Sequence, residues 1–155
     1  TNGGVWEIEG RSIRPRRSPL RAPVNDISWD YEGTVATAHE DGTARLWKSD
    51  GRPKASVPAL EGAGACTAVA WWNGQLLRAF DNGEVRLDGH TGGIVFRGHQ
   101  GRVNSIATGG AGGVLATAGA DGTVRLWHPD QSPRPMLPGH GEGQPMWAVS
   151  WSPDG

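Results

Sequence analysis

The sequence has almost no cysteine and no long apolar run. Cys66 is the single cysteine in 155 residues, so no disulfide can form within the chain. No apolar run approaches the ~20 residues that a membrane-spanning helix needs. The N-terminal stretch TNGGVWEIEG also lacks the charged-then-apolar layout of a secretory signal. These absences lead us to expect a soluble protein of the cytoplasm.

The sequence also lacks an excess of charge of either sign. It contains 15 Lys and Arg residues against 16 Asp and Glu residues. A chain so close to balance has no overall electrostatic attraction to nucleic acid or to an anionic membrane. We therefore expect neither nucleic acid nor a membrane as a partner.

Helical periodicity is missing as well, since no window repeats its apolar residues every 3.6 positions. The apolar residues occur instead in short runs that Gly, Pro, Asn and Asp separate, and glycine alone accounts for 25 residues. Short apolar runs between turn-forming residues are typical of strands. The sequence therefore predicts an all-β fold.

What the sequence does contain is a repeat. ATAHEDGTARLW (Ala36–Trp47) and ATAGADGTVRLW (Ala116–Trp127) agree at most positions and start 80 residues apart. LRAFDNGEVRLD (Leu77–Asp88) lies midway and keeps the turn and the following strand, so the period is about 40 residues. A second recurring run precedes each copy and is found once more near the C-terminus: VNDISW, CTAVAW, VNSIAT and MWAVSW.

Each unit is expected to contain four short strands, which we letter a to d in chain order. In the best-preserved unit they lie at about Val103–Thr108, Val114–Ala118, Thr123–Trp127 and Pro135–Leu137. The Asp-Gly pair between the second and third strands predicts a tight hairpin, because these residues tolerate positive φ.

A unit of this form resembles the WD-repeat β-propeller family, most clearly over GHQGRVNSIATGGAGGVLATAGADGTVRLWHPD (Gly98–Asp130). The resemblance implies four-stranded antiparallel blades and, for this chain, an incomplete ring. It divides the chain into strands c and d of a partial blade (1–22), a blade (23–62), a degenerate blade (63–99), a blade (100–140) and strand a of a further blade (141–155). We expect the last strand, Met146–Trp151, to expose Val149 and Trp151.

The resemblance also implies a structural network that ties the strands of a blade together. In the third unit its members are His99, Thr117, Asp121 and Trp127. Indole only donates, carboxylate only accepts, and hydroxyl and imidazole do both, so the four side chains can satisfy one another. The first unit keeps Thr37, Asp41 and Trp47 but has Leu20 at the histidine position. The second has Gly62, Arg78, Asn82 and Asp88 in the four places, which predicts a blade without such a network.

No motif indicates catalysis, a metal or a cofactor. The five histidines lack the spacing of a zinc site. Asp, Gly and Thr are consecutive at Asp41–Thr43, which does not match the spaced box found in propeller glycosidases. The arginine-rich stretch Arg11–Arg21 fits either a site for an acidic partner or an exposed edge strand.

The resemblance therefore implies a non-catalytic platform for protein–protein interaction, as a scaffold or sensor part of a larger protein. In the family, the face with the d–a and b–c loops is the common docking surface. The residues placed there are Asn25, Glu40, Thr67, Asp81, Arg102, Asn104 and Trp147. Two alternatives stay open: an enzyme with its site at the mouth of the channel, and an architectural half-ring that closes by self-association.

Overall fold

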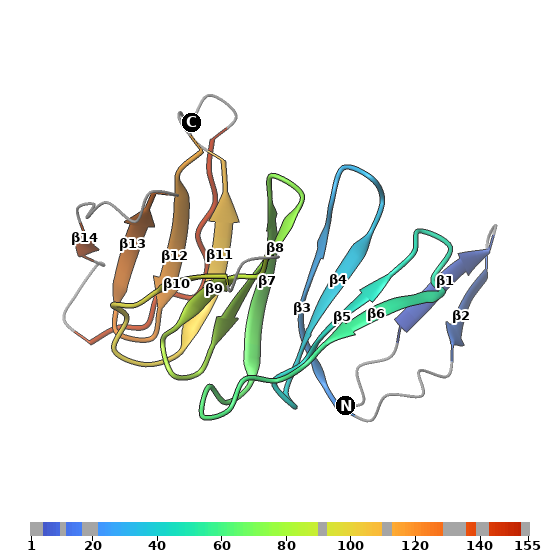
Figure 1. Cartoon of the computed structure of the whole chain (residues 1–155), viewed down its shortest axis with the longest axis horizontal. Helices are drawn as coiled ribbons and strands as arrows, with labels where there is room; N and C mark the ends of the chain where they lie inside the picture. Colours follow the sequence, from blue (N-terminus) through green and yellow to red (C-terminus); the bar gives the residue numbers. More distant parts are fainter. Residues whose placement is uncertain are drawn as a thin grey trace.

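The chain folds into antiparallel sheets that stand side by side (Figure 1). The structure is a computed structural model that describes residues 5–9, 12–16, 22–89, 93–109, 113–128, 136–138 and 143–152; for 5–9, 12–16, 136 and 138 it describes the backbone alone. In these ranges every assigned element is a strand. The all-β prediction is therefore confirmed. No helix in the described ranges is long and apolar enough to span a membrane.

Three sheets have four strands each, and in each the strands pair in chain order. The first blade comprises β3 (Val24–Trp29), β4 (Val35–His39), β5 (Ala44–Trp47) and β6 (Pro53–Val57). The second comprises β7 (Cys66–Trp72), β8 (Gln75–Phe80), β9 (Val85–Leu87) and β10 (Ile94–Phe96). The third comprises β11 (Val103–Thr108), β12 (Leu115–Gly119), β13 (Thr123–Trp127) and β14 (Met136–Pro138). A two-stranded sheet of β1 (Val5–Glu9) and β2 (Ser12–Arg16) precedes them.

The predicted four-stranded antiparallel blades are therefore present, and their row is open rather than closed into a ring (Figure 1). Within each full blade, alternation of side chains across the sheet gives two faces. In the first blade, Ala36, Ala38 and Ala44 face the second blade, and Thr37 and Trp47 lie on the opposite face.

The core lies between neighbouring blades. One apolar cluster joins Ala36, Ala38 and Ala44 to Val69 and Phe80 across the first and second blades. A second cluster joins the second and third blades and includes Leu77, Val85, Phe96, Val103 and Leu115. Burial of these faces gives adjacent blades their main cohesion, because each sheet covers apolar surface of the next.

The glycine of each b–c turn allows the next loop to approach closely. Gly42, Gly83 and Gly122 all have positive φ, as the tight turns require. A Cβ on Gly83 would lie 2.5 Å from the His99 carbonyl oxygen, and one on Gly122 would lie 2.9 Å from that of Gln144. These turns therefore contact the loop that leads into the following blade.

The segment at Met146–Trp151 differs from the expectation. It runs beside β11 (Figure 1) but forms no ladder with another described strand. A strand is defined by main-chain bonds to a neighbouring strand, and this segment is held mainly by side-chain bonds to the third blade. Val149 and Trp151 are half-buried there rather than exposed as expected.

Candidate interaction surface

A hydrogen-bond network crosses the third blade from its entry loop to β13. The Trp127 indole Nε1 donates to Thr117 Oγ1 at 2.8 Å, and His99 Nε2 lies 2.7 Å from the same hydroxyl. His99 Nδ1 lies 3.0 Å from Asp121 Oδ2. The structure thus brings together the four side chains that the sequence grouped.

The donors and acceptors of this network fix the protonation state of His99. The Asp121 carboxylate only accepts, so the proton of the neutral ring is on Nδ1 and Nε2 accepts from the Thr117 hydroxyl. Burial, opposed by the bond to Asp121, lowers the pKa of His99 below its usual value of 6.5. Burial by itself raises the pKa of Asp121, but hydrogen bonds from the Gln100 main chain, Thr123 and His99 outweigh it and hold that pKa at about 2.

The first blade has a complete network too, built with a histidine that the sequence analysis did not assign. Trp47 Nε1 donates to Thr37 Oγ1 at 3.0 Å, and His39 Nε2 lies 2.8 Å from that hydroxyl. Arg45 Nη1 lies 3.0 Å from His39 Nδ1, and Arg45 Nη2 donates to Asp41 Oδ2 at 2.6 Å. Arg45 Nη1, which only donates, lies closer to His39 Nδ1 than the Ala22 carbonyl oxygen, which only accepts and lies at 3.3 Å. The shorter contact favours Nδ1 as the acceptor and Nε2 as the donor, the reverse of His99.

His39 and Gly119 occupy the same position of the repeat. This explains why the histidine of the network comes from a strand in the first blade and from a loop in the third. His39 is the last residue of β4, two positions after Thr37, so both side chains lie on one face of the strand. Gly119 ends β12, and a side chain there would collide with the His99 ring and with Asp121. One unit therefore places its imidazole on the strand, and the other leaves that space empty for an imidazole from the loop. Leu20, at the loop position of the first unit, lies outside the described residues.

The second blade has no His–Thr–Asp–Trp network, but an ion pair that the sequence analysis did not predict links two of the four positions. The guanidinium of Arg78 forms two bonds to Asp88, Nε to Oδ2 at 2.6 Å and Nη2 to Oδ1 at 3.0 Å. Its Nη1 donates to the Pro58 carbonyl at 2.8 Å. The Arg78 side chain is 2% exposed. An ion pair thus joins the two positions that hold threonine and tryptophan in the other blades.

The rim formed by the d–a and b–c loops is assembled in the same way in each blade. The residue before the turn donates its main-chain N–H to the carbonyl of the segment that enters strand a: Glu40 to Pro23 at 3.0 Å, Asp81 to Ala65 at 3.2 Å, and Ala120 to Arg102 at 2.8 Å. These bonds bring the predicted partner-binding positions of one blade together.

Three of the predicted partner-binding residues bridge neighbouring blades. Asn25 Nδ2 donates to the Cys66 carbonyl at 2.9 Å, Thr67 Oγ1 to the Val103 carbonyl at 2.5 Å, and Asn104 Nδ2 to the Met146 carbonyl at 2.9 Å. Each is the second residue of its strand a, and each acceptor is the first residue of the next unit's recurring run. Thr67 is 4% exposed, so its side chain is not available to a partner. The resemblance predicted that these three residues bind a partner, but in the structure their side chains connect neighbouring blades.

The remaining four predicted residues are accessible. Trp147 is 73% exposed, although tryptophan is usually well buried. Arg102 Nη1 donates to Asp81 Oδ1 at 2.7 Å, and their side chains are 39% and 40% exposed. Glu40 is exposed and accepts a bond from Asn25. The rim thus offers an indole, a partly exposed ion pair and a carboxylate.

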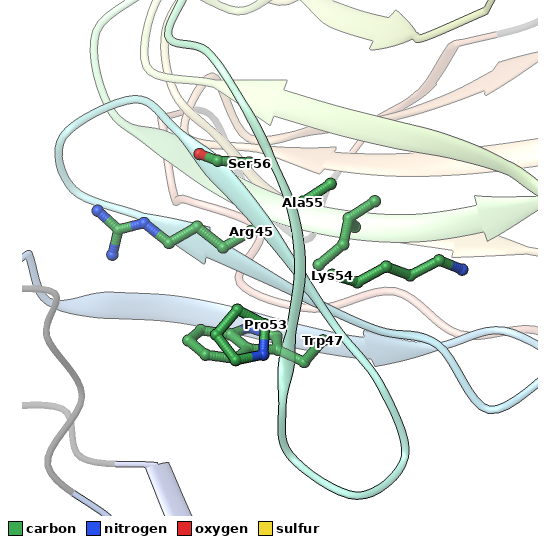
Figure 2. A pocket seen from close by; sticks show the side chains of 7 residues that line it. Arg45, Trp47, Pro53, Lys54, Ala55 and Ser56 are labelled. Atoms are coloured by element: carbon green, nitrogen blue, oxygen red, sulfur yellow. The ribbon is translucent and has the colours of Figure 1, made fainter.

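A hollow beside β5 and β6, within the described ranges, does not assemble catalytic groups. Figure 2 shows this shallow hollow of about 320 Å³, where Trp47 and Pro53 are cross-strand neighbours. Its lining includes Arg45 and Lys54 but no carboxylate, histidine or cysteine. Burial raises the pKa of the Cys66 thiol to about 12, which leaves it unreactive. Within the described ranges no three His, Cys, Asp or Glu side chains are grouped to hold a metal ion.

Comparison with known proteins identifies the repeat. The family described as WD40, "WD domain, G-beta repeat", matches residues 15–48 and 84–128, about half of the chain. No curated protein matches the sequence. Among solved structures, the crystal structure of the computationally designed Ika4 protein is similar, with a TM-score of 0.66 and 17% identity over 86% of this chain and 82% of that one. At that identity the likeness concerns the fold alone.

Proposed function

The chain belongs to the WD40-repeat family, whose repeats generally mediate protein–protein interaction, and from this premise we propose that it is a non-catalytic platform that binds a protein partner through the loop rim. The observation that carries the proposal is Trp147. It lies at the rim position that Asn25 and Asn104 occupy in other units, and it is 73% exposed. Tryptophan is among the commonest hot-spot residues of interfaces.

The neighbouring side chains supply the polar part of this surface. The Arg102–Asp81 pair joins the second and third blades at the rim and keeps more than a third of each side chain exposed. Arginine is also enriched in hot spots, and a guanidinium that forms one ion pair keeps further N–H donors. A partner segment that places an apolar side chain against Trp147 and acceptor groups near Arg102 fits this arrangement.

Absence of catalysis is part of the proposal. WD40 domains are typically non-enzymatic scaffolds. The side chains of His39 and His99 are buried in the blade networks, where they contact Thr37 and Thr117. A general acid or base must reach the substrate, whereas each of these histidines contacts other side chains of its own blade network.

The test uses a random peptide library displayed on phage as the probe. Peptides selected on the immobilised chain should include binders that Trp147→Ala and Arg102→Ala weaken by about 1–4 kcal/mol each. Neither substitution should change the melting temperature much, because both side chains are accessible. Fluorescence titration of the synthetic peptides gives the affinities.

A matched control is available on the first blade. Tyr31 is 84% exposed and lies in the turn after β3, away from the rim loops. Tyr31→Ala should leave the selected peptides bound as before. Recovery of no binders, or binders that only Tyr31→Ala or changes at Arg14 and Arg16 weaken, contradicts the proposal.

A further inference from the structure

Two tight turns of the second blade each contain an Asn-Gly pair. Asn73 and Gly74 join β7 to β8, and Asn82 and Gly83 lie in the turn between β8 and β9. In such a pair the glycine nitrogen can attack the side-chain carbonyl carbon of the asparagine, because glycine has no Cβ to obstruct the approach. Whether the attack occurs in a folded chain depends on how firmly the turn holds both groups.

The Asn82–Gly83 pair is held by hydrogen bonds. Gly83 donates its main-chain N–H to the Phe80 carbonyl at 3.2 Å. Asn82 donates its own N–H to the Ala63 carbonyl at 3.2 Å, and its Oδ1 accepts from the Glu84 N–H at 3.0 Å. The attacking nitrogen and the side chain are therefore both occupied, and the turn cannot rearrange without losing these bonds.

The Asn73–Gly74 pair has no such bonds. Both residues are exposed, and within the described residues neither the Asn73 side chain nor the Gly74 N–H has a hydrogen-bond partner. The φ angles of 49° and 75° indicate a type I′ turn. In a turn of this type the cross-turn bond belongs to the flanking residues, here the paired Trp72 and Gln75, rather than to the glycine between them.

The two turns also differ in the space around the glycine. A Cβ placed on Gly83 would lie 2.5 Å from the His99 carbonyl oxygen. A Cβ placed on Gly74 would have the Tyr31 hydroxyl, at 3.7 Å, as its nearest contact beyond the adjacent residues. In Figure 1 the turn between β7 and β8 projects at the edge of the row, beside the turn between β3 and β4. The Asn73 side chain and the Gly74 nitrogen therefore have room to approach each other.

We propose that Asn73 is a site of hydrolytic deamidation, at which the chain itself supplies the nucleophile and water is the co-reactant. The Gly74 nitrogen gives up its proton to the solvent and forms a bond with Asn73 Cγ. The bond between Cγ and Nδ2 breaks, and the amide nitrogen leaves as ammonia with a proton from water. The product is a cyclic succinimide.

Water then opens the ring at either of its two carbonyl carbons. Attack at Cγ breaks the bond from Cγ to the Gly74 nitrogen and restores the main chain, with aspartate at position 73. Attack at the main-chain carbonyl carbon leaves Gly74 attached through Cγ, which is isoaspartate. In total an amide and a water become a carboxylate and an ammonium ion, and nothing is oxidised or reduced.

The two products differ in their effect on the fold. Aspartate tolerates positive φ as asparagine does, so that product only adds a negative charge at the surface. Isoaspartate adds a methylene to the main chain of a two-residue turn, whose type depends on its length. β7 contributes Val69 to one apolar cluster and Ala70 to the other. A distorted turn therefore acts on the strand that contacts both neighbouring blades.

The test compares the two turns in one sample. The folded chain is incubated at mildly alkaline pH below its melting temperature, beside the same chain unfolded in urea. Trypsin then places Asn73 in the peptide 55–78 and Asn82 in the peptide 79–86, and mass spectrometry follows both. In the folded chain Asn73 should yield aspartate and isoaspartate severalfold faster than Asn82. In urea the two rates should become similar, because the bonds that protect Asn82 are lost.

Two substitutions separate the reaction from its consequence. Asn73→Gly removes the amide and leaves a Gly-Gly pair that favours the same turn. This variant should keep its urea denaturation midpoint during incubation, whereas the unaltered chain should acquire a less stable fraction in step with isoaspartate. Asn82→Asp is the control, since it keeps an oxygen to accept from the Glu84 N–H, and it should react at Asn73 at the unaltered rate.

Three results would overturn the proposal. One is a folded chain in which Asn73 stays intact while the unfolded chain is modified there. Another is a folded chain in which Asn82 reacts as fast as Asn73. The third is a product that contains aspartate without isoaspartate, because opening of a succinimide gives both.

Discussion

A threonine hydroxyl at the centre of a blade can be satisfied by histidines in opposite tautomers. Thr117 accepts from Trp127 and donates to His99, whereas Thr37 accepts from both Trp47 and His39 and donates to the Arg45 carbonyl at 3.3 Å. Each network is closed, which matters because an orphaned polar group in a buried place costs about 1–3 kcal/mol. The stabilising role of these side chains therefore leads to measurable predictions.

Trp127→Phe tests the network of the third blade. The substitution keeps an aromatic ring near Phe96, whose centroid lies 5.6 Å from that of Trp127, but it removes the donor to Thr117. We expect the free energy of unfolding to fall by about 1–3 kcal/mol in urea denaturation. Trp72→Phe is the control, because Trp72 packs on the same cluster and its indole has no hydrogen-bond partner in the described part of the chain. Equal losses in the two variants contradict the assignment.

The buried histidines predict a loss of stability in mild acid. Burial lowers the pKa of His39 below 6.5, and the Arg45 guanidinium acts in the same direction against the Ala22 carbonyl and Asp41. The unfolded chain therefore takes up the proton first as the pH falls, and stability declines from about pH 6.5 until the folded histidine is protonated too. Denaturation midpoints measured across this range should fall with pH. His39→Gln should reduce the change of stability with pH. An unchanged pH dependence would contradict a neutral His39 imidazole in the folded protein.

At the scale of strands, the second blade shows that two positions can be linked by quite different chemistry. Arg78 on β8 and the residue after β9, Asp88, form a two-bond ion pair where the other blades use threonine and tryptophan. If the Asp88 carboxylate is removed, the Arg78 guanidinium, whose side chain is only 2% exposed, is left without its partner charge. Loss of one member of a buried pair is strongly destabilising.

Asp88→Asn is accordingly expected to lower the free energy of unfolding by about 2–3 kcal/mol, below the ~3–5 kcal/mol of fully buried pairs because Asp88 retains some exposure to water. Asp50→Asn serves as the control, since the Asp50–Arg52 pair is exposed and such pairs contribute little. Urea denaturation of both variants gives the comparison. A small effect at Asp88 would show that Arg78 is held by its other contacts alone.

The strands could be predicted from the sequence because they depend on local pattern. Short apolar runs between turn-forming residues predicted strands at Val103–Thr108 and Thr123–Trp127, which are the bounds of β11 and β13. The role of His39 was missed, although the contrast of His39 with Gly119 at one repeat position was a usable signal. The opposite charges of Arg78 and Asp88 were a similar signal for the second blade.

The bridges between blades could not be predicted in the same way. Asn25, Thr67 and Asn104 donate to carbonyls 36 to 42 residues ahead. Such contacts depend on how closely two sheets approach, and no periodicity along the chain encodes that distance. The resemblance placed these residues on a docking rim, whereas packing between blades decides what their side chains contact.

At the scale of the whole molecule, the account assigns different tasks to different tryptophans. Trp127 and Trp47 link strands within one blade, and Trp71 and Trp151 connect one blade to the next. Trp147 is exposed at the rim. Trp29 shares the repeat position of Trp71 but lacks an earlier blade's strand a to cover it within the described residues. Trp29 is the last residue of β3 and lies at the end of that strand away from the rim. Trp29→Glu should therefore not alter the binding of peptides at Trp147.

The most direct test of the central claim measures peptide affinity and unfolding in the same two variants. For Trp147→Ala the account predicts a loss of peptide binding of about 1–4 kcal/mol with the free energy of unfolding unchanged. For Trp127→Phe it predicts lower stability, with peptide affinity retained at temperatures where the variant is folded. The reverse pattern, in which Trp147→Ala destabilises the fold and leaves binding intact, would contradict the division between a binding rim and structural blade networks.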